Sequence, residues 1–143
     1  MAFPVPEPGL VISYSYLWRY EHQTGKQEGR KHRPAVIVLS IEKQDETRIV
    51  TVAPVTHIKP RDLMSCVEIP PSVKQYLGLD HQKSWVILNE VNQFAWPGYD
   101  LTPVPGTKNK FEYGFLPPKL FDIIKAGVLD LIIKRRAGVT NRD

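Results

Sequence analysis

Thirteen prolines break this chain of 143 residues into short pieces. Most of them stand in pairs or small clusters between apolar runs, which favours many short elements over a few long helices. The length suits one domain with a core large enough to fold unaided, and the apolar and charged contents are not those of a disordered chain. We therefore predict a single domain over residues 1–143, with a proline-rich leader at 1–9 and a basic tail at 134–143.

The cysteine content and the first residues bear on the compartment. Cys66 is the only cysteine, so no internal disulfide can form, and a reducing cytoplasm is the simplest location. The opening MAFPVPEPGL has neither a basic segment nor a long apolar run, so it does not resemble a signal peptide. No run approaches the length that crosses a bilayer. We expect a cytoplasmic protein without a membrane segment.

Apolar patterning predicts five or six short strands. They are rich in β-branched and aromatic residues and cover 10–18, 34–41, 48–56, 64–69, 84–96, with a bend near 89–92, and the extended segment 111–116. A short helix is expected at 70–79, and helical spacing of apolar residues predicts a second helix from Pro117 to about Arg136. The fold class that follows is mainly β with helices, as a compact, partly open β-barrel capped by a short helix and a C-terminal helix.

Two polar residues stand at the ends of neighbouring predicted strands. Arg33 directly precedes the strand at 34–41, and Thr56 closes the strand at 48–56. The QDET turn between the strands makes them antiparallel neighbours, so counting pairs outward from it places Arg33 and Thr56 at the same edge of the sheet. Arg33 offers a permanent cation with a fork of donors that matches phosphate, and Thr56 offers a hydroxyl. The pair predicts an anion site.

More charged residues lie on the two connections beside this pair. Glu28 lies before Arg33, and His57 directly follows Thr56. Basic residues gather on both connections, which suits a polyanionic partner; they are Lys26, Arg30, Lys31, Lys59 and Arg61. The simpler alternative is that the charges are solvated surface, since an arginine before a strand and a histidine in a loop are commonly exposed end residues.

The sequence lacks the motifs that hold common cofactors or present a catalytic serine. There is no phosphate-cradling loop, no dinucleotide fingerprint and no GxSxG elbow. The four histidines are scattered, and none stands at a spacing that suits a metal. We predict neither a metal nor a cofactor.

At the residues around Arg33 and Thr56 the sequence resembles the PemK/MazF family of toxin–antitoxin ribonucleases. The family pattern HRPAVVLS is present as HRPAVIVLS, and the ending valine-x-proline-x-threonine as VAPVT. A later acidic strand that closes in Ala-Trp looks like ILNEVNQFAW, and the end looks like YGFLPPKLFDIIKAGVLDLI. The order and spacing agree over nearly the whole chain. The sequence departs from the family at His57, where many members have serine or threonine.

The resemblance implies an SH3-like β-barrel that dimerises and cleaves single-stranded RNA without a metal, leaving a 2′,3′-cyclic phosphate and a 5′-hydroxyl. Arg33 and Thr56 occupy the positions of the family's catalytic pair, and Glu28 matches a glutamate that some members use. The implied partners are single-stranded RNA on the basic connections, an acidic flexible antitoxin segment over the same groove, and a second copy of the chain. The identity of the base is open between Glu28 and His57.

Two other functions are alternatives to the ribonuclease that the resemblance implies. One is an RNA-binding or regulatory module that keeps the barrel but has lost catalysis. The other is a protein-interaction domain, since small SH3-like barrels bind peptides in aromatic-lined grooves. Arg33 and Thr56 together favour the enzyme over both.

Overall fold

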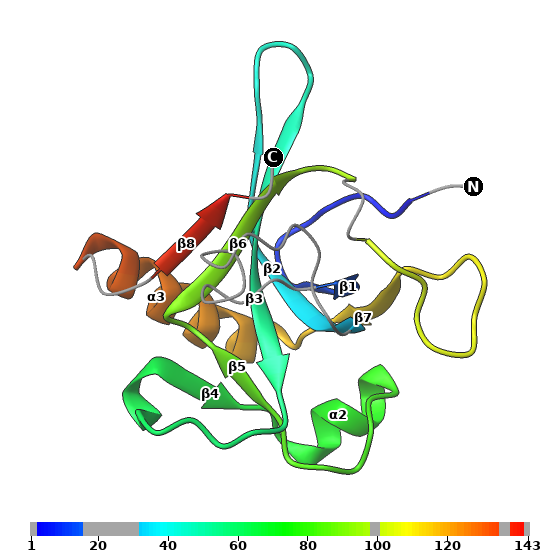
Figure 1. Ribbon diagram of the computed structural model, residues 1–143. Helices are drawn as coiled ribbons and strands as arrows, with labels where there is room; N and C mark the ends of the chain where they lie inside the picture. The colour runs from blue at the N-terminus through cyan, green and yellow to red at the C-terminus, as the bar shows by residue number, and fades with distance from the viewer. Residues whose placement is uncertain (1–2, 16–31, 98–100, 135–137, 142–143) are drawn as a thin grey trace, which may run out of the picture.

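The computed structural model describes residues 3–15, 32–97, 101–134 and 138–141. These residues form an eight-stranded open sheet with two α-helices (Figure 1). The strands are β1 (Leu10–Ser15), β2 (His32–Glu42), β3 (Arg48–Thr56), β4 (Cys66–Glu68), β5 (Trp85–Ile87), β6 (Glu90–Ala95), β7 (Glu112–Phe115) and β8 (Gly138–Asn141). The helices are α2 (Pro71–Leu77) and α3 (Pro118–Ile133), with a 3-10 turn η1 (Leu63–Ser65). The prediction of a mainly β fold with two helices is confirmed.

The sheet is built around β3. Its path runs β4-β5-β3-β2-β1-β7, and β6 pairs with the first half of β3 while β5 pairs with its end. All of these pairings are antiparallel, whereas β8 lies parallel to β6. A strand that changes neighbours halfway along its length makes the sheet bend there, so the polar end of β3 lies beside β5 (Figure 1).

The β2–β3 hairpin is the long antiparallel pair that the QDET turn predicts. Glu42 pairs with Arg48 next to the turn, and Ala35 pairs with Pro54 further out. Within the turn, the backbone N–H of Thr47 donates to the Asp45 carboxylate at 3.1 Å, which stabilises it. The register shifts between Ile37 and Leu39, where β2 holds one extra residue. This β-bulge allows Val38 and Leu39 to pack on the same face of the sheet.

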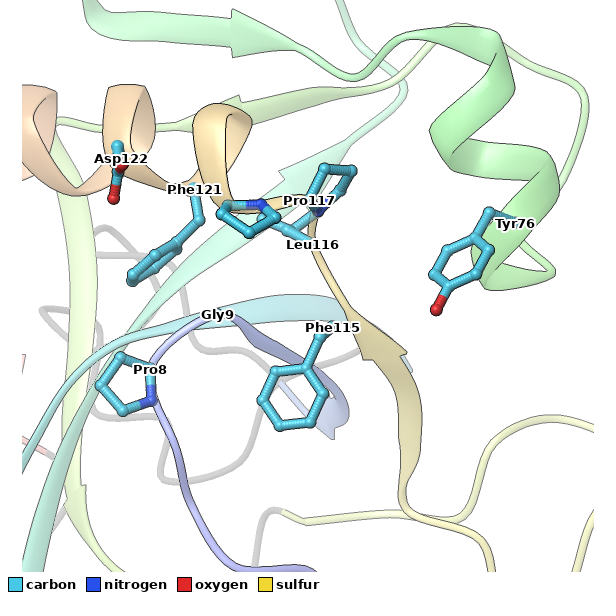
Figure 2. A pocket seen from close by; sticks show the side chains of 9 residues that line it. Pro8, Gly9, Tyr76, Phe115, Leu116, Pro117, Phe121 and Asp122 are labelled. Carbon is cyan, nitrogen blue, oxygen red and sulfur yellow. The ribbon is translucent and has the colours of Figure 1, made fainter.

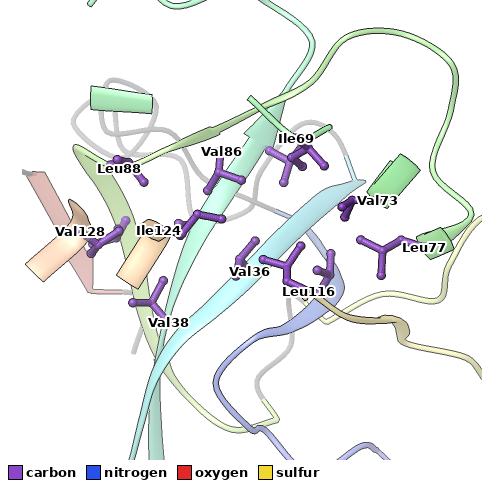
Figure 3. Packing of buried hydrophobic residues seen from close by; sticks show 14 residues of the cluster. Val36, Val38, Ile69, Val73, Leu77, Val86, Leu88, Leu116, Ile124 and Val128 are labelled. Atoms are coloured by element: carbon purple, nitrogen blue, oxygen red, sulfur yellow. The ribbon is translucent and has the colours of Figure 1, made fainter. Parts of the chain in front are cut away.

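Both faces of the central strands are buried. The helix-covered face packs Val36 and Val38 of β2 against Ile124 and Val128 of α3, as Figure 3 shows. The opposite face packs alternate residues of β1, β2, β3 and β6, including Ile12, Ile37, Val52 and Phe94. Successive side chains of a strand point to opposite faces of the sheet. Because both faces are buried here, the strands are apolar along nearly their whole length.

Three sequence predictions need correction. The predicted strand 84–96 is two strands, because the chain turns at Leu88, whose N–H donates to the carbonyl of Ser65 at 2.8 Å. The start of the predicted strand 64–69 is instead the 3-10 turn η1, which Asp62 caps by accepting from the N–H of Met64. The expected basic tail contains β8, which covers the edge of β6.

Both helices begin one residue after the prolines at which the sequence predicts them to start, and α3 ends at Ile133 rather than near Arg136. Pro71 starts α2 and Pro118 starts α3, where the missing N–H is tolerated. Gly78 ends α2 in the left-handed conformation, with φ of 72°. In the part of the chain that the structure describes, neither helix is long and apolar enough to cross a membrane.

Candidate functional site

Arg33 and Thr56 lie at the same end of the sheet. The β2–β3 register pairs Ala35 with Pro54, and continuing it outward places Arg33 opposite Thr56. Arg33 also pairs with Tyr14 of β1, and Thr56 with Trp85 of β5. The structure therefore places at one end of the sheet the two residues that the sequence predicts to lie at the same edge. Their chemical role stays a prediction.

The Thr56 hydroxyl is held in a defined position. Its side chain is buried, with 8% of the residue exposed, and Oγ1 accepts the backbone N–H of Ile58 at 3.1 Å. A hydroxyl that accepts one hydrogen bond still has its own proton to donate. The same bond turns the chain immediately after β3. Thr56 can therefore donate to an anion at the strand end without first breaking a bond of its own.

Strand alternation places two more polar residues on the face that carries Arg33 and Thr56. Val52 pairs with Asn92, and the same register puts Glu90 opposite Pro54. Asn92 is fully buried, and Glu90 is half-buried at the start of β6. The sequence analysis assigned neither a role. The signal that could have found them is the polar run NEVNQ inside an otherwise apolar strand.

Aromatic rings pack on the face of the sheet that carries Arg33 and Thr56. Tyr14 is fully buried, and its ring stacks on Phe94 with 4.9 Å between the ring centroids. Trp96 stacks in turn on Phe94 at 6.0 Å. Large rings in defined contact hold neighbouring strands firmly in place, so Arg33 is presented from a rigid element.

His57 contacts a buried lysine network. Its Nε2 lies 2.6 Å from Oδ2 of Asp80, and Nζ of Lys74 lies 2.7 Å from Oδ1 of the same carboxylate. Lys74 is 5% exposed and also donates to Oγ of Ser84 at 2.7 Å and to the carbonyl of Gln82. Asp80 therefore bridges a buried cation and a half-exposed imidazole. Sequence reasoning missed Lys74 and Asp80, because on a short helix and its following loop both look like surface residues.

The pKa of the Asp80 carboxyl lies below its ordinary value of 3.8. Burial alone would raise this pKa, but the hydrogen bond from Lys74 and the charges of His57 and Lys74 outweigh burial. The carboxylate is thus held ionised by the residues that it connects.

Asp80→Asn should remove part of the pH dependence of stability. A carboxyl whose folded pKa is depressed stabilises the folded state above its unfolded pKa, and that stabilisation is lost as pH falls through the folded value. The free energy of unfolding of the wild type should exceed that of Asp80→Asn at neutral pH, and the gap should close as the pH falls below about 4 and through the lowered pKa of Asp80. Urea denaturation at a series of pH values measures the gap. A gap that stays constant down to low pH would contradict this assignment.

The remaining predicted site residues divide into two groups. Lys59 and Arg61 lie exposed on the connection from β3 to η1. Glu28 lies outside the described residues, as do three of the predicted RNA-binding residues, Lys26, Arg30 and Lys31. Among the residues with described placement, no three His, Cys, Asp or Glu side chains cluster in a way that could hold a metal.

An apolar groove of about 570 Å³ lies away from this site. Figure 2 shows Tyr76, Phe115 and Phe121 around it, with Asp122 at its margin. Gly9 lines the groove just before β1, whereas Tyr14, the partner of Arg33, lies near the other end of that strand. The two features are therefore separated by about 17 Å of strand.

A scan against protein-family models found no match to this chain, and a search of curated proteins found none either.

Proposed function

We propose that this protein is a metal-independent endoribonuclease, the toxin of a type II toxin–antitoxin system with an SH3-like barrel of the PemK/MazF kind. The observation that carries the proposal is the register that sets Arg33 opposite Thr56 at the end of the β2–β3 hairpin. The HRPAVIVLS and VAPVT segments that resemble the family are the segments that form this pair.

The chemistry needs three groups. RNA carries a 2′-hydroxyl next to each phosphate, so cleavage requires loss of that proton, stabilisation of charge on the phosphorus and protonation of the leaving 5′-oxygen. Arg33 is permanently charged and suits stabilisation of the phosphoryl oxygens. Thr56 can donate its hydroxyl proton to a non-bridging oxygen or to the leaving oxygen. The products are a 2′,3′-cyclic phosphate and a 5′-hydroxyl.

Incubation of the wild-type protein with a mixed-sequence single-stranded RNA in the presence of EDTA tests the proposal. Fragments that end in a 2′,3′-cyclic phosphate and begin with a 5′-hydroxyl are expected. Intact RNA, or fragments with 5′-phosphates, would show that the function is wrong.

The basic connection after β3 should form one wall of the RNA groove. Each neutralised phosphate of a single strand contributes about −0.7 to the slope of log affinity against log salt. Replacing both Lys59 and Arg61 by Gln should therefore reduce the slope by about one to two units. A titration of uncleavable 2′-O-methyl RNA at several salt concentrations measures it.

The matched control replaces Lys108 and Lys110 by Gln. These lysines are also exposed, but they lie on the connection between β6 and β7. The control removes the same charge and should leave the slope unchanged. If the wild type and the Lys59/Arg61 variant have equal salt-dependence slopes, these two residues do not contact the RNA.

The proposed function also implies two protein partners. An acidic flexible antitoxin segment would be drawn to the same basic surface and compete with RNA. A second copy of the chain would cover exposed apolar side chains such as Phe115 and Ile123, which are 46% and 59% exposed.

The groove beside α2 favours a second candidate function, a peptide-binding module without catalysis. Tyr76, Phe115 and Phe121 give it the aromatic lining that proline-rich peptides dock against. The RNA assay above separates the two candidates, because this module would leave RNA intact. Saturable binding of a proline-rich peptide, lost in Tyr76→Ala, would then support it.

A further inference from the structure

We propose that His57 is the base that takes the 2′-hydroxyl proton, and that Asp80 and Lys74 are positioning residues that hold its imidazole ready to do so. This inference rests on the proposed ribonuclease function and decides between Glu28 and His57.

The positioning begins at Lys74. Its ammonium group is buried on α2 and is fixed by Oγ of Ser84 at 2.7 Å, by the carbonyl of Gln82 and by Asp80. A buried charge with several partners has little freedom to move, so it fixes one oxygen of the Asp80 carboxylate. The other oxygen, Oδ2, lies 2.6 Å from Nε2 of His57. The orientation of the imidazole is thus set from the protein interior.

This contact selects one tautomer of the neutral imidazole. When Asp80 is ionised it can only accept, so Nε2 of His57 must carry the proton. Nδ1 is then the acceptor, the form that a base needs. The His57 side chain is 46% exposed, so a ligand can reach the ring. Catalytic triads prepare their base by the same kind of carboxylate contact, with the roles of the two ring nitrogens exchanged.

The location of His57 suits an in-line displacement. His57 directly follows Thr56, where the chain turns out of β3, and its contacts through Asp80 and Lys74 connect it to Ser84 on the α2 side of the strand end. Alternation along β3 directs Thr56 to the side that carries Arg33. A phosphate at the end of β3 would therefore have His57 on one side and Thr56 with Arg33 on the other. Attacking and leaving oxygens lie on opposite sides of the phosphorus in such reactions.

Cleavage moves one proton to His57 and one proton from Thr56. Nδ1 of His57 takes the proton of the 2′-hydroxyl while the 2′-oxygen forms a bond to phosphorus. The bond from phosphorus to the 5′-oxygen breaks, and that oxygen takes the hydroxyl proton of Thr56. Arg33 neutralises the negative charge on the non-bridging oxygens. Water then returns a proton to Thr56 and takes one from His57.

The test combines kinetics with imidazole ¹⁵N NMR of uniformly labelled protein. His57→Gln should lower kcat by about 10²- to 10⁴-fold with little change in KM. Asp80→Asn should lower kcat by up to about 10⁴-fold, and Asp80→Glu should recover part of the loss. In the spectra, the wild-type His57 proton should reside on Nε2, and Asp80→Asn should mix the two tautomers. The control is Asp45→Asn, a carboxylate in the hairpin turn that should change none of these readouts.

Each outcome has a distinct consequence. If the wild type cuts RNA and His57→Gln cuts at the same rate, this inference is wrong and the proposed function stands. A wild-type proton on Nδ1 overturns the inference whatever the activity. If the wild type leaves RNA intact, the proposed function fails, and the role of His57 as base fails with it.

Discussion

Replacing Arg33 by alanine is expected to lower the rate of RNA cleavage by about 10²- to 10³-fold, the usual effect of removing one preorganised donor from a charged transition state. Arg33 is half-buried at the start of β2, and Arg33→Ala removes its fork of donors while leaving the apolar alternation of the strand intact. Arg33→Lys should recover little activity, because a lysine keeps the charge but lacks the fork. The measurement is single-turnover cleavage of a labelled RNA with EDTA present.

Arg48 supplies the matched control. It lies at the other end of the same hairpin, paired with Glu42 beside the turn. Arg48→Ala should therefore cut RNA at the wild-type rate. If both arginine variants lose activity equally, the effect is one of net charge rather than of a site at the end of the sheet.

Thr56 is tested by a pair of substitutions that separate its hydroxyl from its shape. Thr56→Val keeps the branched side chain in its buried position but has no hydroxyl, and should lower the rate by about 10²- to 10³-fold. Thr56→Ser keeps the hydroxyl that binds the N–H of Ile58 and should retain most activity. Wild-type rates in both Arg33→Ala and Thr56→Val would show that the proposed pair is wrong.

The register of the hairpin shows what the sequence could and could not predict about this site. The short turn correctly predicts that β2 and β3 are antiparallel neighbours. Pairing straight outward from Glu42 and Arg48 would set His57, not Thr56, opposite Arg33. The bulge between Ile37 and Leu39 moves the register by one residue and brings Thr56 there. A one-residue change of register reverses which face each side chain occupies, and no local pattern in the sequence marks this bulge.

The His57 network was beyond sequence reasoning for a different reason. His57, Lys74 and Asp80 come from three separate segments, and each is a polar residue of a kind usually found at the surface. Only the packing of α2 against the sheet buries Lys74 and gives Asp80 its two partners. The strand β8 escaped prediction because a run of four residues carries too little periodicity.

Ile124→Ala is the substitution expected to destabilise the fold most. Ile124 is fully buried on α3 and packs in the cluster that contains Val36, Val38 and Leu88 (Figure 3). Truncation of a buried isoleucine to alanine costs about 2–5 kcal/mol, because apolar contacts are lost and the space left behind closes only in part. Urea denaturation of the wild type and the variant measures the difference in free energy of unfolding.

The neighbouring residue on the same helix gives the control. Ile123 is 59% exposed, so Ile123→Ala should change the free energy of unfolding by no more than about 0.5 kcal/mol. Equal losses for both substitutions would contradict the orientation of α3. Because Val36 and Val38 belong to the strand that presents Arg33, the Ile124→Ala variant should also lose RNA cleavage at lower urea concentrations than the wild type. Below its own unfolding transition it should still cut at the wild-type rate, since Ile124 supports the sheet without contacting its polar end.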